Sequence, residues 1–324
     1  MKSYKCEILE KTLNFLPNKV NFCCSYAEGL NVSYVKDKNF NFADIKKNKK
    51  KYINQLKFGK IPAGCYGCID YKEKKYTNIL DFFFTKSDTS LIKQIIVNHY
   101  KQCDCNCIYC TQRIIWDGDY EQNYELLPII QDLYEHNAID KDNLQVEFQG
   151  GDVTALNEFE SLMRLFMKNG CKCYDIHTNL TKYLPVLEEL PFQSLLSIQI
   201  SLDSGTKETY RKIKQIDALE QVLDNIKMLS IKTNAIINLK YIIIKDVNDN
   251  SYEVNQFLEL VKELRCVNEV SFDIDYRDIV LYKDKKFEIP SYYYDIVKQA
   301  EDFCRENRIM FCLKEYAKMY MEKK

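Results

Sequence analysis

The feature that most constrains the fold is a repeating pattern that begins near Leu91 and continues to about residue 313. Short runs rich in isoleucine, valine and leucine alternate there with longer segments whose apolar residues recur at helical spacing. Such an alternation is typical of a parallel sheet built from βα units. The sequence therefore predicts an α/β fold.

The pattern can be divided into individual elements. The predicted strands lie near Ile92–Asn98, Leu144–Phe148, Cys173–His177, Leu196–Leu202, Ile236–Ile244 and Glu269–Ile274, with a short last strand at Ile309–Leu313. The predicted helices are Tyr124–Glu135, Leu156–Lys168, Tyr183–Leu190, Ala218–Ser230, Tyr252–Leu264 and Tyr292–Asn307. Six βα units match a partial, open (β/α)6 TIM-like barrel, in which reacting groups collect at the carboxyl ends of the strands.

The amino-terminal part has a different character. Residues 1–88 carry two cysteine pairs and a lysine-rich run, Lys46–Lys51, but no clear βα rhythm. We therefore predict a small Cys-rich cap over residues 1–88 and a barrel core over residues 89–324.

The composition narrows the possible partners and compartment. Lys and Arg number 46 and Asp and Glu 47, so the overall charge gives no reason to expect a nucleic-acid partner. The amino terminus lacks the apolar core of a signal peptide, and no uninterrupted apolar run is long enough to span a bilayer. We expect a cytoplasmic protein without a membrane partner. Its 14 cysteines then suit metal or redox roles better than disulfides, and several of them are expected to be core or reduced surface thiols.

One cysteine-rich loop directly follows the first predicted strand. Cys103, Cys107 and Cys110 have Cys-x3-Cys-x2-Cys spacing, and an aromatic residue, Tyr109, precedes the last of them. Three thiolates on one loop suit an iron–sulfur cluster whose fourth iron keeps an open coordination position. A zinc knuckle is the alternative, but the additional Cys105 breaks the usual paired-knuckle spacing.

The spacing, the aromatic residue and the position of the loop together resemble the radical S-adenosylmethionine (SAM) superfamily. The resemblance implies that Cys103, Cys107 and Cys110 hold a 4Fe-4S cluster and that SAM binds its open iron. Only these three cysteines fit the family pattern, so Cys105 is predicted to be a non-ligand.

The next two predicted strands end in motifs similar to those of the same family. Gly150, Gly151 and Asp152 stand where the family has Gly-Gly-Glu, which meets the amino group of SAM. Thr178 and Asn179 resemble its Thr-Asn-Gly, with leucine in place of the glycine. A Gly-Gly turn is also common without any ligand, so the order of the motifs along the chain carries the prediction.

The fourth predicted strand leads into Ser201-Leu-Asp203, followed by Tyr210 and a basic segment. This run is similar to one in the branch of the family that modifies peptides and carries extra cluster domains. The resemblance implies that Ser201 and Asp203 lie beside the SAM ribose or carboxylate and that Arg211 pairs with the carboxylate. Taken singly, Asp203 could equally be a helix N-cap.

Two further cysteine pairs lie in the amino-terminal segment. Cys23 and Cys24 are separated by about forty residues from Cys65 and Cys68, a spacing that two segments can bridge around a metal. The four thiols could hold a second iron–sulfur cluster, a zinc ion, or nothing. The arrangement is similar to the SPASM or twitch segments of the family, except that those usually follow the barrel.

The resemblance implies a radical SAM enzyme. It would cleave SAM reductively to a 5′-deoxyadenosyl radical that abstracts hydrogen from a peptide or small polar substrate, with electrons from a donor such as flavodoxin or ferredoxin. One alternative is a radical SAM epimerase or dehydrogenase of sugar or cofactor biosynthesis. A second alternative is a non-catalytic iron–sulfur scaffold or sensor.

Overall fold

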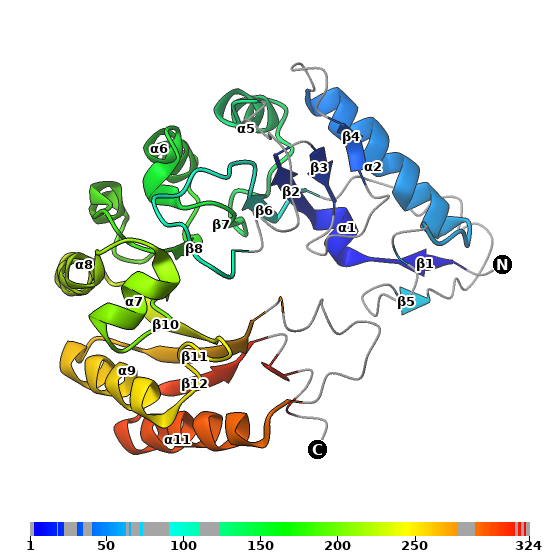
Figure 1. Cartoon of the computed structure of the whole chain (residues 1–324). Coiled ribbons are helices and arrows are strands. Elements are labelled where there is room, and N and C mark those ends of the chain that lie inside the picture. The colour runs from blue at the N-terminus through cyan, green and yellow to red at the C-terminus, as the bar shows by residue number, and fades with distance from the viewer. Residues whose placement is uncertain are drawn as a thin grey trace. The chain divides into compact units, whose positions relative to one another are not determined.

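Strands alternate with helices along most of the chain in the computed structural model, and most neighbouring strands run parallel (Figure 1). The structure describes residues 3–17, 19–22, 31–34, 41–62, 65, 72–73, 91–110, 124–275, 277, 289–314, 317–318 and 321. The chain divides into two compact units. The first unit comprises residues 1–101, 119–150 and 157–174, and the second comprises residues 102–118, 151–156 and 175–324.

The first unit contains a mixed sheet. Its strands follow the order β7 (Gln145–Phe148), β6 (Gln94–Val97), β2 (Thr12–Leu16), β3 (Lys19–Asn21) and β4 (Asn31–Tyr34). The pairs β7–β6 and β6–β2 are parallel, whereas β2–β3 and β3–β4 are antiparallel. Strands β2 and β6 pair in parallel and are almost entirely buried, as is typical of parallel strands.

Helices and two very short strands complete the first unit. They are β1 (Tyr4–Lys5), α1 (Glu7–Lys11), α2 (Phe42–Lys57), β5 (Lys72–Glu73), α5 (Leu127–Glu135) and α6 (Phe159–Lys168). Helix α2 begins with a capping box, in which Asn41 and Asp44 satisfy each other's backbone N–H groups. The helix is fixed to α5 by the backbone N–H of Phe42, which donates to Oδ2 of Asp132 at 2.8 Å.

The second unit continues the βα repeats. Its strands follow the order β8 (Cys173–Thr178, with its last four residues in this unit), β9 (Leu195–Ser201), β10 (Ile236–Ile243), β11 (Glu269–Ile274) and β12 (Met310–Leu313). The strands from β9 to β12 pair in parallel.

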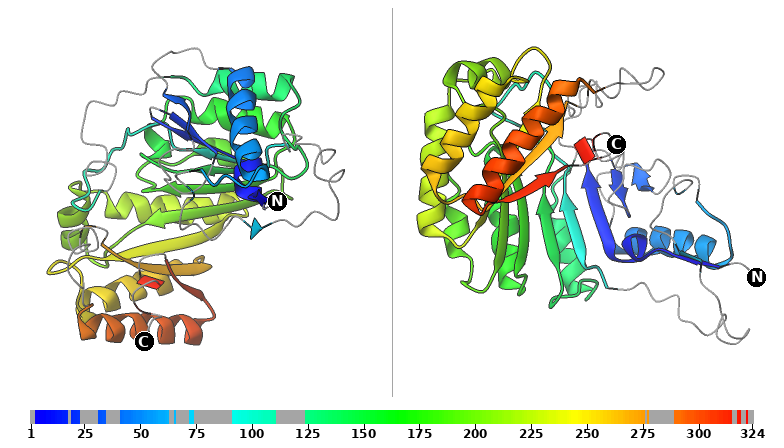
Figure 2. Two further views of the ribbon diagram at one scale, coloured as in Figure 1. Left: turned by 90° about the vertical axis from the view of Figure 1, so that its right-hand side faces the viewer. Right: turned by 90° about the horizontal axis from the view of Figure 1, so that it is seen from below.

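Short and long helices connect the strands of the second unit. They are the 3-10 segments η2 (Val153–Ala155) and η3 (Pro185–Glu189), and the helices α7 (Lys207–Lys214), α8 (Leu219–Lys232), α9 (Ser251–Leu264) and α11 (Ser291–Asn307). Helices α9 and α11, yellow and orange in Figure 2, lie together on one side of β11 and β12. The rings of Tyr241, Phe257 and Phe272 pack together in the core between strand and helix, with Tyr241 stacked on Phe272.

The α/β class is confirmed, and the mostly parallel strands are consistent with a partial TIM-like barrel. Every strand predicted from residue 92 onward is present, and the predicted helices are present apart from Tyr183–Leu190, which is a 3-10 segment over Pro185–Glu189. Helix α7 was not predicted. The boundary near residue 88 stays a prediction; on its amino-terminal side, β2 pairs with β6.

None of the helices in the described part of the chain is long and apolar enough to cross a membrane.

Candidate functional site

The cysteine loop lies in the second unit and is attached to the end of helix α7. The backbone N–H of Asn106 donates to the carbonyl of Lys214 at 2.9 Å, and that of Ile108 donates to the carbonyl of Ile213 at 3.0 Å. Ile108 also packs against a small apolar cluster, as does Tyr109; the cluster consists of Ile213, Ile242 and Ile244. The loop is thus held by backbone bonds and by apolar contacts.

The thiols of the loop differ in exposure and in acidity. Cys103, Cys107 and Cys110 are partly exposed, whereas Cys105 is buried. Hydrogen bonding from Cys105, assisted by the ammonium of Lys214, lowers the pKa of Cys107 to about 6. Its bonds to Cys103 and Cys107 raise the pKa of Cys105 itself. Because the thiolate is the ligand form of cysteine, the loop favours metal-binding thiolates and keeps Cys105 protonated.

A buried ion pair lies directly behind the loop. Lys214 and Asp203 are both fully buried, with Nζ 2.5 Å from Oδ2 of the carboxylate. Nζ also donates to the hydroxyl of Tyr109 at 2.9 Å and to Oδ1 of Asn179 at 3.2 Å. The Tyr109 hydroxyl donates in turn to Oδ2 of Asp203, while Oδ1 accepts from the backbone N–H of Ile242 at 2.8 Å.

This network joins the cysteine loop, the ends of β8 and β9, and helix α7 through one ammonium group. Burial acts to lower the pKa of Lys214, but the adjacent Asp203 carboxylate, together with Tyr109 and Cys107, outweighs it and raises the pKa well above its usual value. Lys214 therefore remains charged, and all three of its ammonium protons have an acceptor.

Asp152 makes a second set of bonds at the edge of the site. Its Oδ1 accepts from Thr154 N at 2.9 Å, from Thr154 Oγ1 at 2.7 Å and from Thr178 Oγ1 at 3.0 Å. Its Oδ2 accepts from the backbone N–H of Asn179 at 2.5 Å. The Asn179 side chain donates to the Cys103 sulfur at 3.5 Å, so Asp152 supports the asparagine that contacts a cysteine of the loop.

The Gly-Gly turn is required by close packing. Gly150 has φ +111°, and a Cβ there would lie 2.4 Å from Asn98 Oδ1 and 3.1 Å from the carbonyl of Tyr100. Leu180 occupies the position where the family has glycine, and it takes the same kind of left-handed backbone, with φ 53°. Its fully buried side chain and the bond from Asn225 Nδ2 to its carbonyl, at 2.9 Å, hold that conformation.

Some of the residues predicted from the sequence contact one another or the cysteine loop in the described part of the chain, and others do not. The structure brings the motifs of Asp152, Thr178, Asn179 and Asp203 into contact with one another or with the cysteine loop. Ser201 is half-buried at the end of β9, next to Lys240 in the register of β10, and Gly151 is also half-buried. Arg211 is exposed on α7 and takes no part in the network formed by the described residues.

The amino-terminal cysteines are only partly covered by the structure. Cys23, Cys24 and Cys68 lie outside the described residues. Cys65 is buried, and its backbone N–H donates to the carbonyl of Pro62 at 2.8 Å. The second metal site therefore stays a prediction.

The sequence reasoning missed Lys214 and left Cys105 without a role. Lys214 belongs to the basic segment that follows Tyr210. Tyr210, Ile213 and Lys214 nevertheless share one helical face at i, i+3 and i+4. That spacing was the available signal, because a lysine beside two apolar residues on one face of a helix is placed for burial.

Comparison with known proteins gives a family match. Residues 97–258, half of the chain, match the family model described as Radical SAM superfamily. A GTP 3′,8-cyclase from Helicobacter pylori is 30% identical over 176 residues, which cover 53% of this chain and 53% of that protein. A probable dual-specificity RNA methyltransferase RlmN from Clostridioides difficile is 23% identical over 247 residues, covering 69% of this chain and 70% of that protein.

A solved structure shares the fold over more of the chain. The crystal structure of Streptococcus suis SuiB bound to precursor peptide SuiA covers 84% of this chain and 63% of SuiB, with a TM-score of 0.52 and 12% identity. At this identity the likeness shows the fold alone. This chain spans about half the length of the cyclases it matches.

The family implies an enzyme whose cofactors are a 4Fe-4S cluster and SAM. The donor set fits such a cluster, since three partly exposed thiols share one loop and the pKa of one of them is lowered to about 6. On the match over residues 97–258, the chain belongs to the radical SAM superfamily.

Proposed function

We propose that this enzyme generates a 5′-deoxyadenosyl radical with a cluster held by Cys103, Cys107 and Cys110, and that the radical abstracts hydrogen from a peptide or small polar substrate. When bound, the cluster and SAM supply a one-electron reductive cleavage that the side chains of this protein could not perform. The observation that carries the proposal is the buried Lys214 ammonium, which bonds to Tyr109 of the cysteine loop and to the ends of the two strands that carry family motifs.

The residues around the loop then have two different roles. Asp152, Thr178 and Asp203 are buried and have their oxygens occupied by partners within the protein, so we assign them to positioning. Gly151 and Ser201 are half-buried, and we assign to them the contacts with SAM. This proposal differs from what the family resemblance implies, namely that Asp152 meets the SAM amino group and that Asp203 lies beside the SAM ribose or carboxylate.

Asn179 contacts both a cysteine of the loop and the buried lysine. Its side-chain N–H donates to the Cys103 sulfur at 3.5 Å, and its carbonyl oxygen accepts from Lys214 at 3.2 Å. A hydrogen bond to a ligating sulfur stabilises the added electron of a reduced cluster. We therefore propose that Asn179 orients Cys103 and raises the reduction potential of the cluster.

The likeness to SuiB, which was crystallised with a precursor peptide, supports a peptide substrate. The 30% identity to a GTP 3′,8-cyclase supports the second candidate, a reaction on a small molecule. Placement within the SPASM or twitch branch rests on the amino-terminal cysteines and belongs to the same proposal. A flavodoxin or ferredoxin is the proposed electron donor, because SAM cleavage consumes one electron at low potential.

The test is formation of 5′-deoxyadenosine by protein reconstituted with iron and sulfide under anaerobic conditions. We expect the wild type to produce it from SAM and dithionite, and Cys107→Ala to produce none. Cys266→Ala is the matched control, because Cys266 is also partly exposed but lies outside the loop, after α9. A wild-type protein that carries its cluster but leaves SAM intact would favour the scaffold or sensor alternative.

A further inference from the structure

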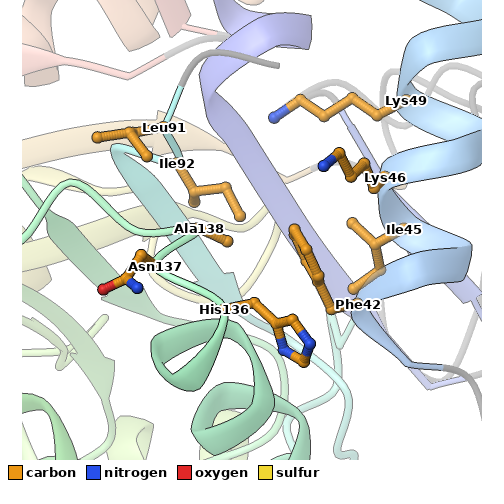
Figure 3. A pocket seen from close by; sticks show the side chains of 9 residues that line it. All are labelled: Phe42, Ile45, Lys46, Lys49, Leu91, Ile92, His136, Asn137 and Ala138. Atoms are coloured by element: carbon orange, nitrogen blue, oxygen red, sulfur yellow. The ribbon is translucent and has the colours of Figure 1, made fainter. Parts of the chain in front are cut away.

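A cavity in the first unit lies among α2, the residues that precede β6 and the end of α5 (Figure 3). Its volume is about 130 Å³. Apolar side chains form much of its wall, namely Ile45, Leu91, Ile92 and Ala138. Two lysines of α2, Lys46 and Lys49, extend from the helix toward the side that Leu91 and Ile92 form (Figure 3).

Lys49 is the unusual member of this lining. Its side chain is 2% exposed, and its ammonium nitrogen has no hydrogen-bond partner among the residues that the structure describes. Lys214, the other buried lysine among the described residues, has three oxygen partners within 3.2 Å. Burial lowers the pKa of Lys49 to about 7, and the carboxylate of Glu10 opposes this only in part.

Glu10 does not act as an ion-pair partner for the ammonium group of Lys49. Its carboxylate lies 3.8 Å from Nζ of Lys5, and the described residues include no ion pair between Glu10 and Lys49. Burying an ammonium group without a partner costs several kcal/mol and favours the neutral amine, so an anion beside Lys49 would complete its bonding and restore its charge. A buried lysine with a shifted pKa that lines a cavity is a candidate for a binding site.

Phe42 and His136 form an aromatic part of the lining that is held in place. The rings of Phe42 and His136 stack with their centroids 4.9 Å apart, and Nζ of Lys46 lies 5.6 Å from the Phe42 centroid. Asp132 accepts from the Phe42 N–H and pairs with Nδ1 of His136 at 3.0 Å, so this acidic group is already engaged at the rim. The charge that remains uncompensated in the cavity is positive.

We propose that this cavity binds a short-chain organic carboxylate. The carboxylate would accept from Lys49, with Lys46 beside it, while the aliphatic part packs against Ile45, Leu91 and Ile92. A water molecule occupies about 30 Å³ in the liquid, so the cavity has room for a small acid of roughly four carbons. All the residues involved belong to the first unit, and the proposal does not depend on the radical SAM site.

The test is isothermal titration calorimetry of the full chain, with its cluster reconstituted, against butyrate, butyramide and inorganic phosphate. We expect butyrate to bind at least about tenfold more tightly than butyramide, which has the same shape without the charge. Butyrate should also bind more tightly than phosphate, which has no apolar part to fill the cavity. The comparison of these three ligands uses only the wild type and so does not depend on the folding of any variant.

Two variants test whether Lys49 is the lysine that binds the carboxylate. Lys49→Met keeps the apolar stem and should weaken butyrate binding at least about tenfold. Lys50→Met is the matched control, because Lys50 is the exposed neighbour on the same helix, and it should leave the affinity unchanged. The proposal is overturned if millimolar butyrate gives no binding heat, if butyramide or phosphate binds as tightly as butyrate, or if Lys49→Met binds butyrate like the wild type.

Discussion

At the scale of single residues, Lys214 affects the arrangement of the site most. Its ammonium group lies 2.5 Å from Asp203 and reaches Tyr109 and Asn179, which belong to different segments of the site. A buried ion pair adds little net stability, but removing one partner leaves an uncompensated charge in the interior. The intact ion pair therefore contributes less to net stability than to fixing the loop relative to the strand ends.

We expect Lys214→Met to lower the free energy of unfolding by about 3 kcal/mol, because Asp203 would remain buried and charged. Lys212→Met, at an exposed position of the same helix, should change it by less than about 0.5 kcal/mol. Adding Asp203→Asn to Lys214→Met should recover part of the loss, since no unpaired charge would remain. Urea unfolding of the apoproteins measures all three; equal stability of Lys214→Met and the wild type would contradict this account.

We predict that Cys105 affects the acidity of the Cys107 thiol rather than metal binding. Its hydrogen bond lowers the pKa of Cys107 to about 6, so Cys105→Ala should raise that pKa toward the ordinary thiol value. At pH 7 the Cys107 thiolate fraction should then fall from nearly complete to a small part. Alkylation of the apoprotein across pH, with the modified cysteine located by mass spectrometry, measures the change. An unshifted pH profile would show that Cys105 does not donate to Cys107.

At the scale of elements, the strands and most helices could be predicted because hydrophobic periodicity is local. The cysteine loop could also be predicted, because the cysteine spacing and the aromatic neighbour both lie within the segment from Cys103 to Cys110. The partners of Asp152 and Asp203 could not be predicted, because most of their side-chain contacts join residues 11 to 94 positions apart. Sequence alone suggested an N-cap at Asp203, but the N-cap of α7 is Thr206.

The turn after β7 allows a controlled test of packing. Gly150 and Gly170 both have positive φ, but a Cβ on Gly150 would meet Asn98 Oδ1 at 2.4 Å, whereas one on Gly170 would meet nothing within 4 Å. We expect Gly150→Ala to lower the free energy of unfolding by about 2–4 kcal/mol and Gly170→Ala by about 1 kcal/mol. Thermal and urea unfolding measure the difference; equal losses would mean that the turn is not tightly packed.

At the scale of the whole molecule, the open question is how many clusters the chain carries. If Cys23, Cys24, Cys65 and Cys68 hold a second cluster, the wild type should bind more iron than one 4Fe-4S cluster contains. A variant with Cys103, Cys107 and Cys110 all changed to alanine should then keep the remainder. We expect this residual iron, measured by elemental analysis after reconstitution. Iron-free variant protein that is otherwise folded would exclude the second iron site.

The central claim is that SAM meets an open iron on a cluster held by Cys103, Cys107 and Cys110. Electron paramagnetic resonance of the dithionite-reduced protein, recorded with and without SAM, tests it most directly. We expect SAM to change the cluster signal in the wild type and in Cys105→Ala, and we expect this SAM-sensitive signal to be absent from Cys107→Ala. A reduced cluster whose signal is the same with and without SAM, or a SAM-sensitive signal that persists in Cys107→Ala, would contradict the assignment.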